Sequence, residues 1–388
     1  MMSFGGSSDV AAVESPEILR VLMVSTSYPT DLNDWRGLFM RHMAFALGRR
    51  ADVQLRLWAP PGETHENVAF ELHGDERARL SELMAAGGIA HMLRRRQPRG
   101  FMAALWLLRA LRRVYRRNAD ADLFHANWLQ SALPVPHGGK PLLVTVLGTD
   151  MQLMRLPMMR LLLRRAFRDR RVAICPNADW MLPQLREAFG DVAEVAFIPF
   201  GIDPRWYAVE RNITSSPMRW LAVTRLTQGK LGPLLEWAAP LFRGAGRELH
   251  LFGPMQEDIV LPDWVRYHGP ASPDVLREQW FPVATGLITL SQHSEGRPQV
   301  MLEAMAAGLP IIASDIPAHT SFLRHGETGW LCGGPDDLVS ALAELEKHGR
   351  NGRIGAAARD WARQAVGTWD DCATRYVRMY RRLQGGAP

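Results

Sequence analysis

The segment SEGRPQVMLEAMAAGLPII, residues 294–312, decides how the second half of the chain folds. An apolar stretch at residues 286–290 precedes it and predicts a buried strand. Pro298 is typical of the first turn of a helix, where its missing N–H costs no hydrogen bond, and Gly308 is typical of a helix end. The segment therefore predicts a strand, a loop and a helix over residues 298–307, the repeating unit of parallel α/β sheets.

Two glutamates stand on either side of the predicted helix start. Glu295 falls in the loop and Glu303 falls within the helix. The N–H groups of Gln299 and Val300 have no acceptor inside the helix, so the helix start favours an anion, and the carboxylates suit sugar or ribose hydroxyls. The alternatives are a solvated loop carboxylate, the polar edge of an amphipathic helix, and a glycosidase pair. A glycosidase pair flanks one bond at about 5–10 Å, whereas eight helical residues span roughly 12 Å.

The chain of 388 residues is long enough for two domains. Short apolar stretches alternate with helical patterns, which indicates parallel sheets with helices on both faces. The expected strands are residues 20–25, 53–58, 122–125, 142–146, 172–175 and 195–199 in the first half, and 220–223, 248–252, 265–268, 286–290 and 310–314 in the second.

We therefore predict two Rossmann-like domains that face each other across a cleft. The first spans residues 18–203 and the second residues 218–368, with a linker at 204–217 that is rich in Pro, Ser and Asn. No GxGxxG motif follows the first strand, so a dinucleotide-binding fold has no direct support. Residues 1–17 are small, polar and acidic and are expected to form a disordered tail.

The net charge of +6 lies entirely in the first half of the chain. Residues 1–200 hold 26 Lys and Arg against 20 Asp and Glu, whereas residues 201–388 hold 20 of each. Such asymmetry favours an anionic partner of the first domain: a membrane surface, a nucleic acid or a phosphorylated substrate. The first 17 residues lack the features of a signal peptide, and the three separated cysteines fit neither a zinc site nor a disulfide framework. We expect a cytoplasmic protein.

Arginines gather in two stretches of the first half. Residues 94–117 hold nine arginines and no acidic residue, and on a helix five of them share one face: Arg109, Arg112, Arg113, Arg116 and Arg117. Met102 and Trp106 project to that side, while the opposite, core-facing side carries Leu107, Leu108, Leu111 and Tyr115. A second stripe consists of Arg160, Arg164, Arg168 and Arg171. These faces suit an anionic bilayer, with the protein peripheral on it, or they are simply solvated.

Several motifs, taken in order, resemble one family. SEGRPQVMLEAMAAGLPIIASD resembles the E-x7-E signature of the retaining GT-B glycosyltransferases of family 4. VTRLTQGKLG is similar to that family's G-R-L-x-x-x-x-K-G phosphate loop, with Arg225 and Lys230 at the matching spacing. SYPTDLNDWRGLFMRHMAFAL resembles its acceptor-side first loop, with Gly37 at the glycine position, and further resemblances lie in HANW, VLGTD, IPFGID, HGETGWL and TWDDCATRYVRMYRRL. The resemblance covers most of the chain and implies the GT-B fold, whose last helix, about residues 369–384 here, packs back on the first domain.

The resemblance also implies a role for each matching residue. Glu295 would contact the hydroxyls of the transferred sugar, with the backbone N–H groups of Gly296 and Arg297 beside it. Glu303 would hold the nucleotide ribose. The diphosphate would be held by Arg225 and Lys230, because fixed cations stabilise the negative charge that develops as the sugar–phosphate bond breaks.

The implied activity is transfer of a sugar, with retention of configuration, from a nucleotide-diphosphate sugar to a glycan or lipid-linked acceptor. UDP is the commonest nucleotide of such donors, no metal or cofactor is expected, and the setting would be bacterial polysaccharide synthesis. Two other functions stay open: a sugar-nucleotide epimerase of the same fold, and a catalytically silent scaffold of an assembly complex. No nucleic-acid-binding module is visible, so we expect no nucleic-acid partner.

Five positions depart from the family pattern or invite a second interpretation. Leu147 stands where many members have a histidine; its backbone carbonyl suffices if only that atom touches the donor, and otherwise donor choice changes. Asn127 replaces a histidine, and Phe200 replaces an asparagine and is expected to pack in the core. Asp150 is expected to cap a helix. Arg297 replaces a common aromatic residue and is expected on the surface, with an acidic sugar or phosphate as its alternative partner.

Overall fold

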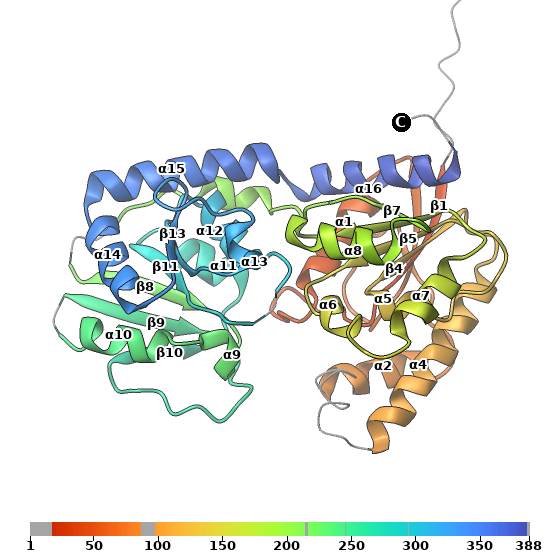
Figure 1. Cartoon of the computed structure of the whole chain (residues 1–388), viewed down its shortest axis with the longest axis horizontal. Coiled ribbons are helices and arrows are strands. Elements are labelled where there is room, and N and C mark those ends of the chain that lie inside the picture. Colours follow the sequence, from red (N-terminus) through yellow and green to blue (C-terminus); the bar gives the residue numbers. More distant parts are fainter. Residues whose placement is uncertain (1–17, 87–97, 214–215, 245, 294, 386–388) are drawn as a thin grey trace, which may run out of the picture.

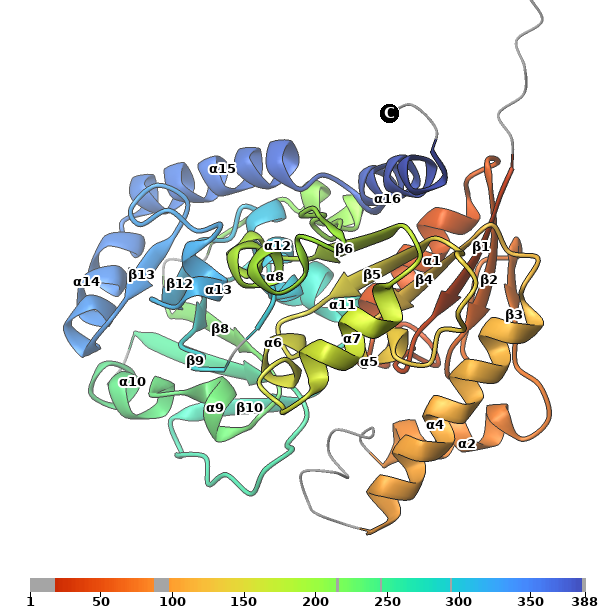
Figure 2. The ribbon, with the colours of Figure 1, turned by 45° about the vertical axis from the view of Figure 1, so that its right-hand side comes forward.

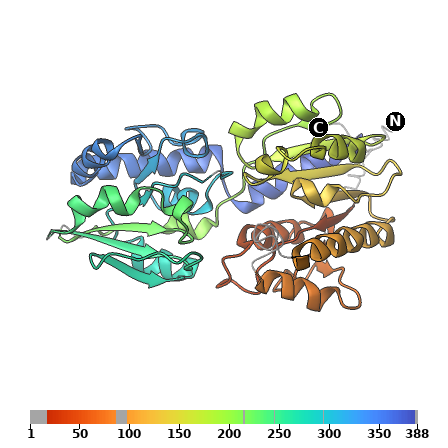
Figure 3. The same ribbon diagram turned by 60° about the horizontal axis from the view of Figure 1, so that its bottom comes forward.

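The computed structural model describes residues 18–86, 98–213, 216–244, 246–293 and 295–385. Two parallel sheets, each flanked by helices, form two domains that lie side by side (Figures 1 and 3). The expected tail, residues 1–17, and the arginines at 94–96 lie outside the described residues.

The first domain is built on a seven-stranded sheet. Its strands are β1 (Leu19–Val24), β2 (Val53–Trp58), β3 (Val68–Phe70), β4 (Leu123–Asn127), β5 (Leu142–Val146), β6 (Val172–Pro176) and β7 (Glu194–Val195). They pair in parallel in the order β3-β2-β1-β4-β5-β6-β7, and Val21 of β1 lies opposite Leu55 of β2 and Leu123 of β4. The helical elements of this domain are α1 (Leu38–Gly48), α2 (Glu76–Ala85), α4 (Pro98–Arg117), α5 (Leu129–Ala132), α6 (Asp150–Leu153), α7 (Met159–Phe167), the 3₁₀ turn η1 (Asp179–Met181) and α8 (Leu182–Phe189).

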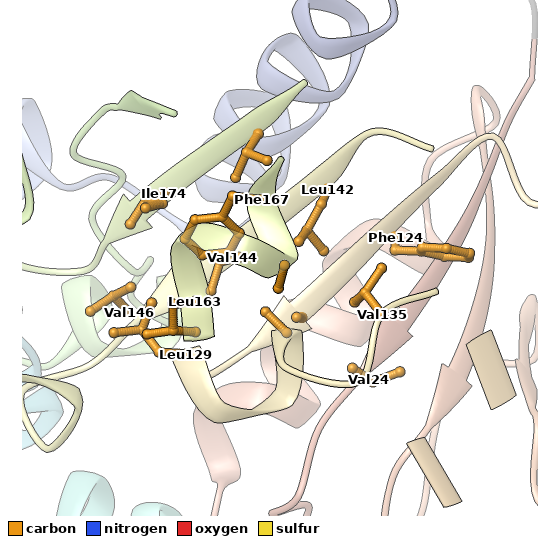
Figure 4. Packing of buried hydrophobic residues seen from close by; sticks show 14 of the residues in the cluster. Val24, Phe124, Leu129, Val135, Leu142, Val144, Val146, Leu163, Phe167 and Ile174 are labelled. Atoms are coloured by element: carbon orange, nitrogen blue, oxygen red, sulfur yellow. The ribbon is translucent and has the colours of Figure 1, made fainter. Parts of the chain in front are cut away.

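The central strands of this sheet are buried on both faces. Every residue of β5, Leu-Leu-Val-Thr-Val, is buried, as is typical of a strand that helices cover from both sides. Figure 4 shows part of the core on one face, where Leu163 and Phe167 of α7 pack with Val144 of β5 and Ile174 of β6. This core holds the strand ends, and therefore the loops that follow them, in fixed positions.

The second domain is built on a six-stranded parallel sheet. Its strands are β8 (Met218–Val223), β9 (Arg247–Phe252), β10 (Val265–Gly269), β11 (Gly286–Thr289), β12 (Ile311–Ser314) and β13 (Trp330–Cys332), in the order β10-β9-β8-β11-β12-β13. Its helical elements are the 3₁₀ turn η2 (Pro204–Ala208), α9 (Gln228–Leu231), α10 (Leu234–Phe242), α11 (Pro273–Val275), the π-helical turn η3 (Leu276–Trp280), α12 (Gln299–Ala306), α13 (Pro317–Thr320), α14 (Pro335–Leu345) and α15 (His348–Ala365). Trp206 of η2, within the stretch expected as a linker, packs into the core of this domain.

The last helix, α16 (Trp369–Gln384), returns to the first domain and packs on α1 (Figures 1 and 2). The Tyr380 hydroxyl lies 2.7 Å from His125 Nδ1, and the Tyr376 hydroxyl lies 3.0 Å from Thr145 Oγ1. The capping box of Thr368 and Asp371 starts this helix at the point where the chain crosses between the domains. The expected pair of Rossmann-like domains and the returning helix are thus confirmed.

The two crossings between the domains touch each other. The Ile202 N–H donates to the Gly367 carbonyl at 3.1 Å. A Cβ on Gly201 would lie 2.4 Å from the Thr368 carbonyl carbon, so only glycine lets the crossings approach this closely.

Some sequence predictions of strands were wrong. Two strands, β3 and β13, were not expected, because three residues are too short to show a period of two. The strand expected at residues 195–199 is only Glu194–Val195, and Pro199, which has no N–H, follows in irregular structure. Of the helices in the described ranges, none combines the length and the apolar character that crossing a bilayer requires.

Candidate active site

A short loop and helix after β8 carry the two cations of the predicted site. Thr227 accepts a hydrogen bond from the Lys230 N–H through Oγ1 at 3.2 Å and so caps α9, which fixes the backbone of the lysine. The Lys230 side chain is only 13% exposed, and its Nζ lies 2.6 Å from Glu295 Oε1. Arg225 points to the first domain, with its guanidinium carbon 5.6 Å from the ring centre of Trp35.

Glu295 lies in the loop between β11 and α12, as predicted, and it is largely buried. Ser291 Oγ donates to Glu295 Oε1 at 2.9 Å, beside the ammonium of Lys230. Burial alone would raise the pKa of this carboxyl, but Lys230 and Ser291 together lower it below its usual value. Burial lowers the pKa of Lys230 and outweighs the attraction of Glu295. The structure therefore brings a cation and a carboxylate to one point.

The start of α12 has two N–H groups without an acceptor inside the helix, as the sequence predicted. Pro298 is the N-cap, one residue before the helix, and its carbonyl accepts from the N–H groups of Met301 and Leu302. The N–H groups of Gln299 and Val300 precede these bonds and have no acceptor within the helix. The Gln299 side chain donates to the Gly201 carbonyl at 2.8 Å, so it holds the helix start to the crossing between the domains.

Glu303 is the fifth residue of α12, about one turn from its start, and is partly exposed. Burial and, to a smaller degree, the negative charge of Asp203 raise the pKa of Glu303 to about 8. Its carboxyl therefore keeps its proton at neutral pH and is able to donate as well as accept a hydrogen bond. Asp203 itself is paired with Arg205, which lowers the pKa of Asp203 although burial opposes this.

The first domain closes this site with the loop after β5. A Cβ on Gly148 would lie 2.2 Å from the Glu295 carbonyl carbon, so glycine is needed for the two backbones to meet. Leu147 precedes it, partly buried against the core of its own domain, and its N–H donates to Asp150 Oδ2 at 2.7 Å. The Asp150 carboxylate also accepts from the N–H of Leu129, the first residue of α5, so it joins that helix start to the loop after β5. Asp150 was expected as the N-cap of its own helix, but Thr149 holds that position. Burial raises the pKa of Asp150 to about 7.

A second close approach forms at the loop after β6. Trp180 Nε1 donates to the Gly296 carbonyl at 3.3 Å, and a Cβ on Gly296 would lie 2.3 Å from Asn177 Oδ1. Neither Trp180 nor Asn177 was singled out from the sequence. Their role lies in contacts with the second domain, and no local motif marks such contacts. The loops that meet here follow the carboxyl ends of strands in both sheets, where α/β domains bind ligands.

Gly37 fulfils a structural role in the first loop of the first domain. It precedes α1 with a φ of 73°, and a Cβ would lie 2.7 Å from Ser27 Oγ. The glycine therefore lets the loop fold back on the end of β1, near Trp35, the residue that Arg225 approaches.

Comparisons with known proteins agree with this geometry. Residues 221–348, which include the phosphate loop and both glutamates, match the family described as glycosyl transferases group 1. Over 305 residues the chain is 25% identical to a GDP-mannose-dependent alpha-(1-6)-phosphatidylinositol monomannoside mannosyltransferase of Mycobacterium tuberculosis, covering 69% of this chain and 78% of that protein. Residues 221–348 therefore form a domain of the glycosyl transferases group 1 family.

Other similarities of this group 1 glycosyltransferase support the assignment. A D-inositol 3-phosphate glycosyltransferase of Gordonia bronchialis is 30% identical over 156 residues, which are 33% of this chain and 34% of that protein. Among solved structures, the sucrose-phosphate synthase of Thermosynechococcus elongatus superposes with a TM-score of 0.69 at 17% identity, over 95% of this chain and 99% of that one. HepE of Anabaena, solved in complex with UDP, gives a TM-score of 0.65 at 15% identity, over 94% and 100%. These structures show the GT-B fold, and the protein is a glycosyltransferase that uses a nucleotide sugar.

Arg297 is buried in this group 1 glycosyltransferase, so the expected surface position was wrong. Only 3% of its side chain is exposed. Its guanidinium carbon lies 4.9, 5.2 and 5.8 Å from the ring centres of Phe197, Phe322 and Trp361, and its Nη2 lies 3.6 Å from Asp179 Oδ1. Burial lowers the pKa of Arg297 to about 10, which Asp179 partly opposes. Phe197 and Asp179 belong to the first domain, so the arginine links the two domains through partners that are distant in the sequence.

Phe200 and Asn127 are also buried in this group 1 glycosyltransferase. The Phe200 ring stacks on Phe39 at 5.3 Å between ring centres and lies 5.6 Å from the Trp369 ring, so the predicted core packing is confirmed. Asn127 donates from Nδ2 to the Val24 carbonyl at 3.1 Å and thereby joins the ends of β4 and β1.

The arginine face of α4 in the group 1 glycosyltransferase is smaller than predicted. Arg109, Arg112, Arg113 and Arg116 are exposed, and Leu107, Leu111 and Tyr115 are buried on the other side, as expected. Arg117 instead pairs with the buried Glu76 at 2.7 Å, and Trp106 packs against the core, with the guanidinium carbon of Arg79 5.5 Å from its ring centre. A periodic pattern places side chains on one face but does not show where the next helix covers that face.

The second arginine stripe is also divided. Arg164 pairs with Asp191 and Arg171 donates to the Leu383 carbonyl, whereas Arg160 and Arg168 are exposed. Four large apolar side chains before and within α7 are between 47% and 64% exposed: Leu156, Met158, Leu161 and Leu162. Arg155, Arg160 and Arg165 are exposed in the same segment. We call these seven residues the α7 surface.

Proposed function

We propose that the protein transfers a sugar, with retention of its anomeric configuration, from a nucleotide-diphosphate sugar to a glycan or lipid-linked acceptor. The observation that carries this proposal is the ion pair of Lys230 and Glu295, which sets one cation and one carboxylate at the meeting point of the two domains. Sugar transfer uses a cation beside the leaving diphosphate and a hydrogen-bond acceptor beside the hydroxyls of the transferred sugar. Lys230 supplies the cation and Glu295 supplies the hydrogen-bond acceptor.

The roles of the remaining residues follow from their places around this pair. Arg225 and Lys230 bind the diphosphate, together with the free N–H groups of Gln299 and Val300 at the start of α12. Glu295 and the backbone N–H groups of Gly296 and Arg297 bind the sugar. Glu303, whose protonated carboxyl donates and accepts, binds the ribose hydroxyls. The Leu147 backbone contributes a wall of the donor site from the first domain.

The reaction we infer proceeds on one face of the sugar. The hydroxyl of the acceptor attacks the anomeric carbon from the side on which the diphosphate leaves, a new C–O bond forms, and the sugar–phosphate bond breaks. A diphosphate oxygen takes the proton of the attacking hydroxyl. Arg225 and Lys230 stabilise the negative charge that develops on the leaving diphosphate. Such electrostatic stabilisation is usually the largest single contribution to lowering the barrier.

The acceptor side is assigned to the loop that contains Trp35 and Gly37. Support comes from the approach of Arg225 to the Trp35 ring, which brings this loop of the first domain to the phosphate loop of the second. An aromatic ring beside the diphosphate offers an apolar face on which a sugar ring of the acceptor is able to pack.

We propose that the acceptor is lipid-linked and that the protein binds the inner face of the cytoplasmic membrane as a peripheral enzyme. The α7 surface supports this, since exposed leucine and methionine beside arginine is the composition that inserts into an anionic interface. The four exposed arginines of α4 add positive charge on the same domain. The mycobacterial relative is named for a phosphatidylinositol monomannoside acceptor, in agreement with this proposal.

The donor nucleotide is proposed from the relatives, and two bases are supported. HepE was solved with UDP, whereas the mycobacterial relative is named for GDP-mannose. UDP is the choice expected from the family, and GDP is its direct competitor.

A thermal-shift screen of UDP-, GDP- and ADP-sugars, followed by an assay of donor consumption with acceptor extracts, tests the proposal. A ligand at 100 times its Kd adds about 2.7 kcal/mol to the free energy of unfolding, so the correct donor raises Tm clearly. Consumption only in the presence of acceptor supports transfer, and conversion of the donor without acceptor indicates an epimerase. A protein that binds no nucleotide sugar and consumes none is a scaffold, and the proposal fails.

A further inference from the structure

A chain of three buried residues lies behind Glu295 on the side away from the first domain. Ser291 follows β11, Ser314 ends β12, and His319, five residues after Ser314, lies in α13. All three are buried, and the His319 side chain has no exposed surface. Ser314 falls near the end of the signature segment quoted in the sequence analysis, but none of the three was given a role there.

The direction of each hydrogen bond in this chain is fixed by chemistry. His319 Nδ1 lies 3.0 Å from the Ser314 carbonyl oxygen, which only accepts, so Nδ1 carries the proton. The same Nδ1–H reaches Ser314 Oγ at 3.2 Å. Ser314 Oγ donates to the Ser291 carbonyl at 2.5 Å, and Ser291 Oγ donates to Glu295 Oε1 at 2.9 Å. Every donor in the chain therefore points toward the carboxylate.

The carboxylate is oriented by these contacts. Within the described residues, both the Ser291 hydroxyl and the Lys230 ammonium bind Oε1 of Glu295, which leaves Oε2 for a ligand. The loop is also held from the other side, because the Gln292 N–H donates to the Gly229 carbonyl of α9 at 2.9 Å. Loss of one link would let the Glu295 side chain rotate without removing its charge.

Packing alone does not account for a histidine at position 319. Among the described residues, its Nε2 is buried without a hydrogen-bond partner, which costs about 1–3 kcal/mol. A leucine of similar size would fill the space without that cost. Glu295 and Lys230 both act electrostatically on the imidazole, and burial lowers the pKa of His319, so the ring is neutral and adds no charge to the pair.

We propose that His319 is a positioning residue of the transfer reaction: through Ser314 and Ser291 it holds Glu295 so that Oε2 faces the hydroxyls of the transferred sugar while Oε1 keeps Lys230. This assignment rests on the proposed function. It concerns the sugar and not the nucleotide, because the chain ends on Glu295, whereas the diphosphate is bound by Arg225 and Lys230 and the ribose by Glu303.

The test compares four variants: His319→Leu, His319→Asn, Ser291→Ala and Ser340→Ala. Leucine keeps the volume and loses the donor, while the asparagine amide places an N–H where Nδ1 was. Ser340, on α14 of the second domain and exposed, is the matched serine control. For each variant we measure kcat and KM of transfer, the Kd of the corresponding nucleoside diphosphate without sugar, and Tm.

We expect His319→Leu and Ser291→Ala to lower kcat by about 10- to 100-fold, the rate equivalent of one hydrogen bond to a charged group. The Kd of the nucleoside diphosphate stays within about twofold, and His319→Asn and Ser340→Ala stay near wild type. Wild-type kcat in His319→Leu or in Ser291→Ala overturns the assignment, as does an equal loss in His319→Asn and His319→Leu. Where His319→Leu fails to fold, Ser314→Ala takes its place, because it removes only the hydroxyl that links His319 to the Ser291 carbonyl; wild-type kcat in that variant also overturns the assignment. If the wild-type protein consumes no nucleotide sugar, the proposed function itself is wrong, and this outcome is distinct from a failure of the role of His319.

Discussion

Lys230 Nζ lies 2.6 Å from Glu295 Oε1, so the cation assigned to the diphosphate is paired with the carboxylate assigned to the sugar. An ammonium has three N–H donors, so Lys230 is able to bind a diphosphate oxygen while Glu295 Oε1 keeps its contact and Oε2 stays directed to the sugar. The diphosphate and the sugar of the donor therefore meet a lysine and a glutamate whose charges already balance each other. This pairing lowers the free-energy cost of keeping the two charged side chains buried.

The first prediction concerns that lysine. Lys230→Ala removes the charge that stabilises the leaving diphosphate and leaves Glu295 buried without its partner. We expect kcat to fall about 10²- to 10³-fold, the usual cost of one such group. The measurement is kcat at saturating donor, with Tm recorded alongside. Lys347→Ala is the matched control, because Lys347 forms only an exposed pair with Glu344. Near wild-type turnover of Lys230→Ala would refute the site.

The second prediction concerns the contact between the domains. Gly148→Ala places a methyl group 2.2 Å from the Glu295 carbonyl carbon, so the two loops must separate. We expect loss of most transfer activity and a larger radius of gyration by solution X-ray scattering, while each domain stays folded. Gly352→Ala on α15 is the control, since a Cβ there meets no atom within 4 Å. Equal activity in both variants would show that the site does not need this approach.

The third prediction concerns Arg297. Arg297→Ala removes its contacts with three aromatic rings and with Asp179, and desolvated cation–π contacts contribute about 2 kcal/mol or more. We expect a clear fall in Tm for Arg297→Ala and a smaller one for Arg297→Met, which keeps the apolar stem against the rings. Thermal unfolding of both variants checks this. An unchanged Tm in Arg297→Ala would mean that the aromatic surroundings contribute no stability.

The fourth prediction is a dependence on pH. The pKa of Glu303 rises from an ordinary 4.5 to about 8 in the folded protein, so between these values the folded state binds the proton more than the unfolded state does. The contribution of this carboxyl to the free energy of unfolding therefore falls as pH rises from about 5 to about 8. Glu303→Gln cannot lose a proton, so its Tm relative to wild type should increase over that range. Parallel curves of Tm against pH would contradict the assignment.

The fifth prediction tests the membrane proposal. The double variant Leu161→Glu and Leu162→Glu places two negative charges on the α7 surface. We expect it to abolish co-sedimentation with vesicles that contain anionic lipid, whereas Val339→Glu, a comparably exposed position on α14, leaves co-sedimentation unchanged. Equal binding of the wild type to neutral and anionic vesicles, or no binding, would rule out the proposed surface.

The sequence predicted most of the strands and helices of the two domains, for a physical reason. Strands such as β5 are continuous apolar runs because they are buried on both faces, and Pro298 and Gly308 delimit α12 through their own backbone restrictions. Arg225 and Lys230 lie close together in the sequence, and so do Glu295 and Glu303, so the spacing within each pair was informative. The short strands β3 and β13 carry no such signal.

What the sequence missed depends on contacts between distant segments. Arg297 was expected on the surface because the three aromatic rings that surround it, at residues 197, 322 and 361, are distant from it in the sequence. Asp150 was expected to cap a helix, but its carboxylate turns to the N–H groups of Leu129 and Leu147. Arg117 was assigned to a solvent-facing stripe, although Glu76 of another helix binds it. In each case a charged side chain has a partner that no local pattern reveals.

The adjoining crossings at Ile202 and Gly367 have a consequence for dividing the protein in two. A fragment that ends after the first crossing would lack α16, and the surface around His125 and Thr145 that Tyr376 and Tyr380 fill would be open to water. The complementary fragment would carry α16 as an exposed, half-apolar arm. Two such halves, produced as separate chains, should therefore find each other through that arm and reconstitute one enzyme, whereas either half alone should be prone to aggregation.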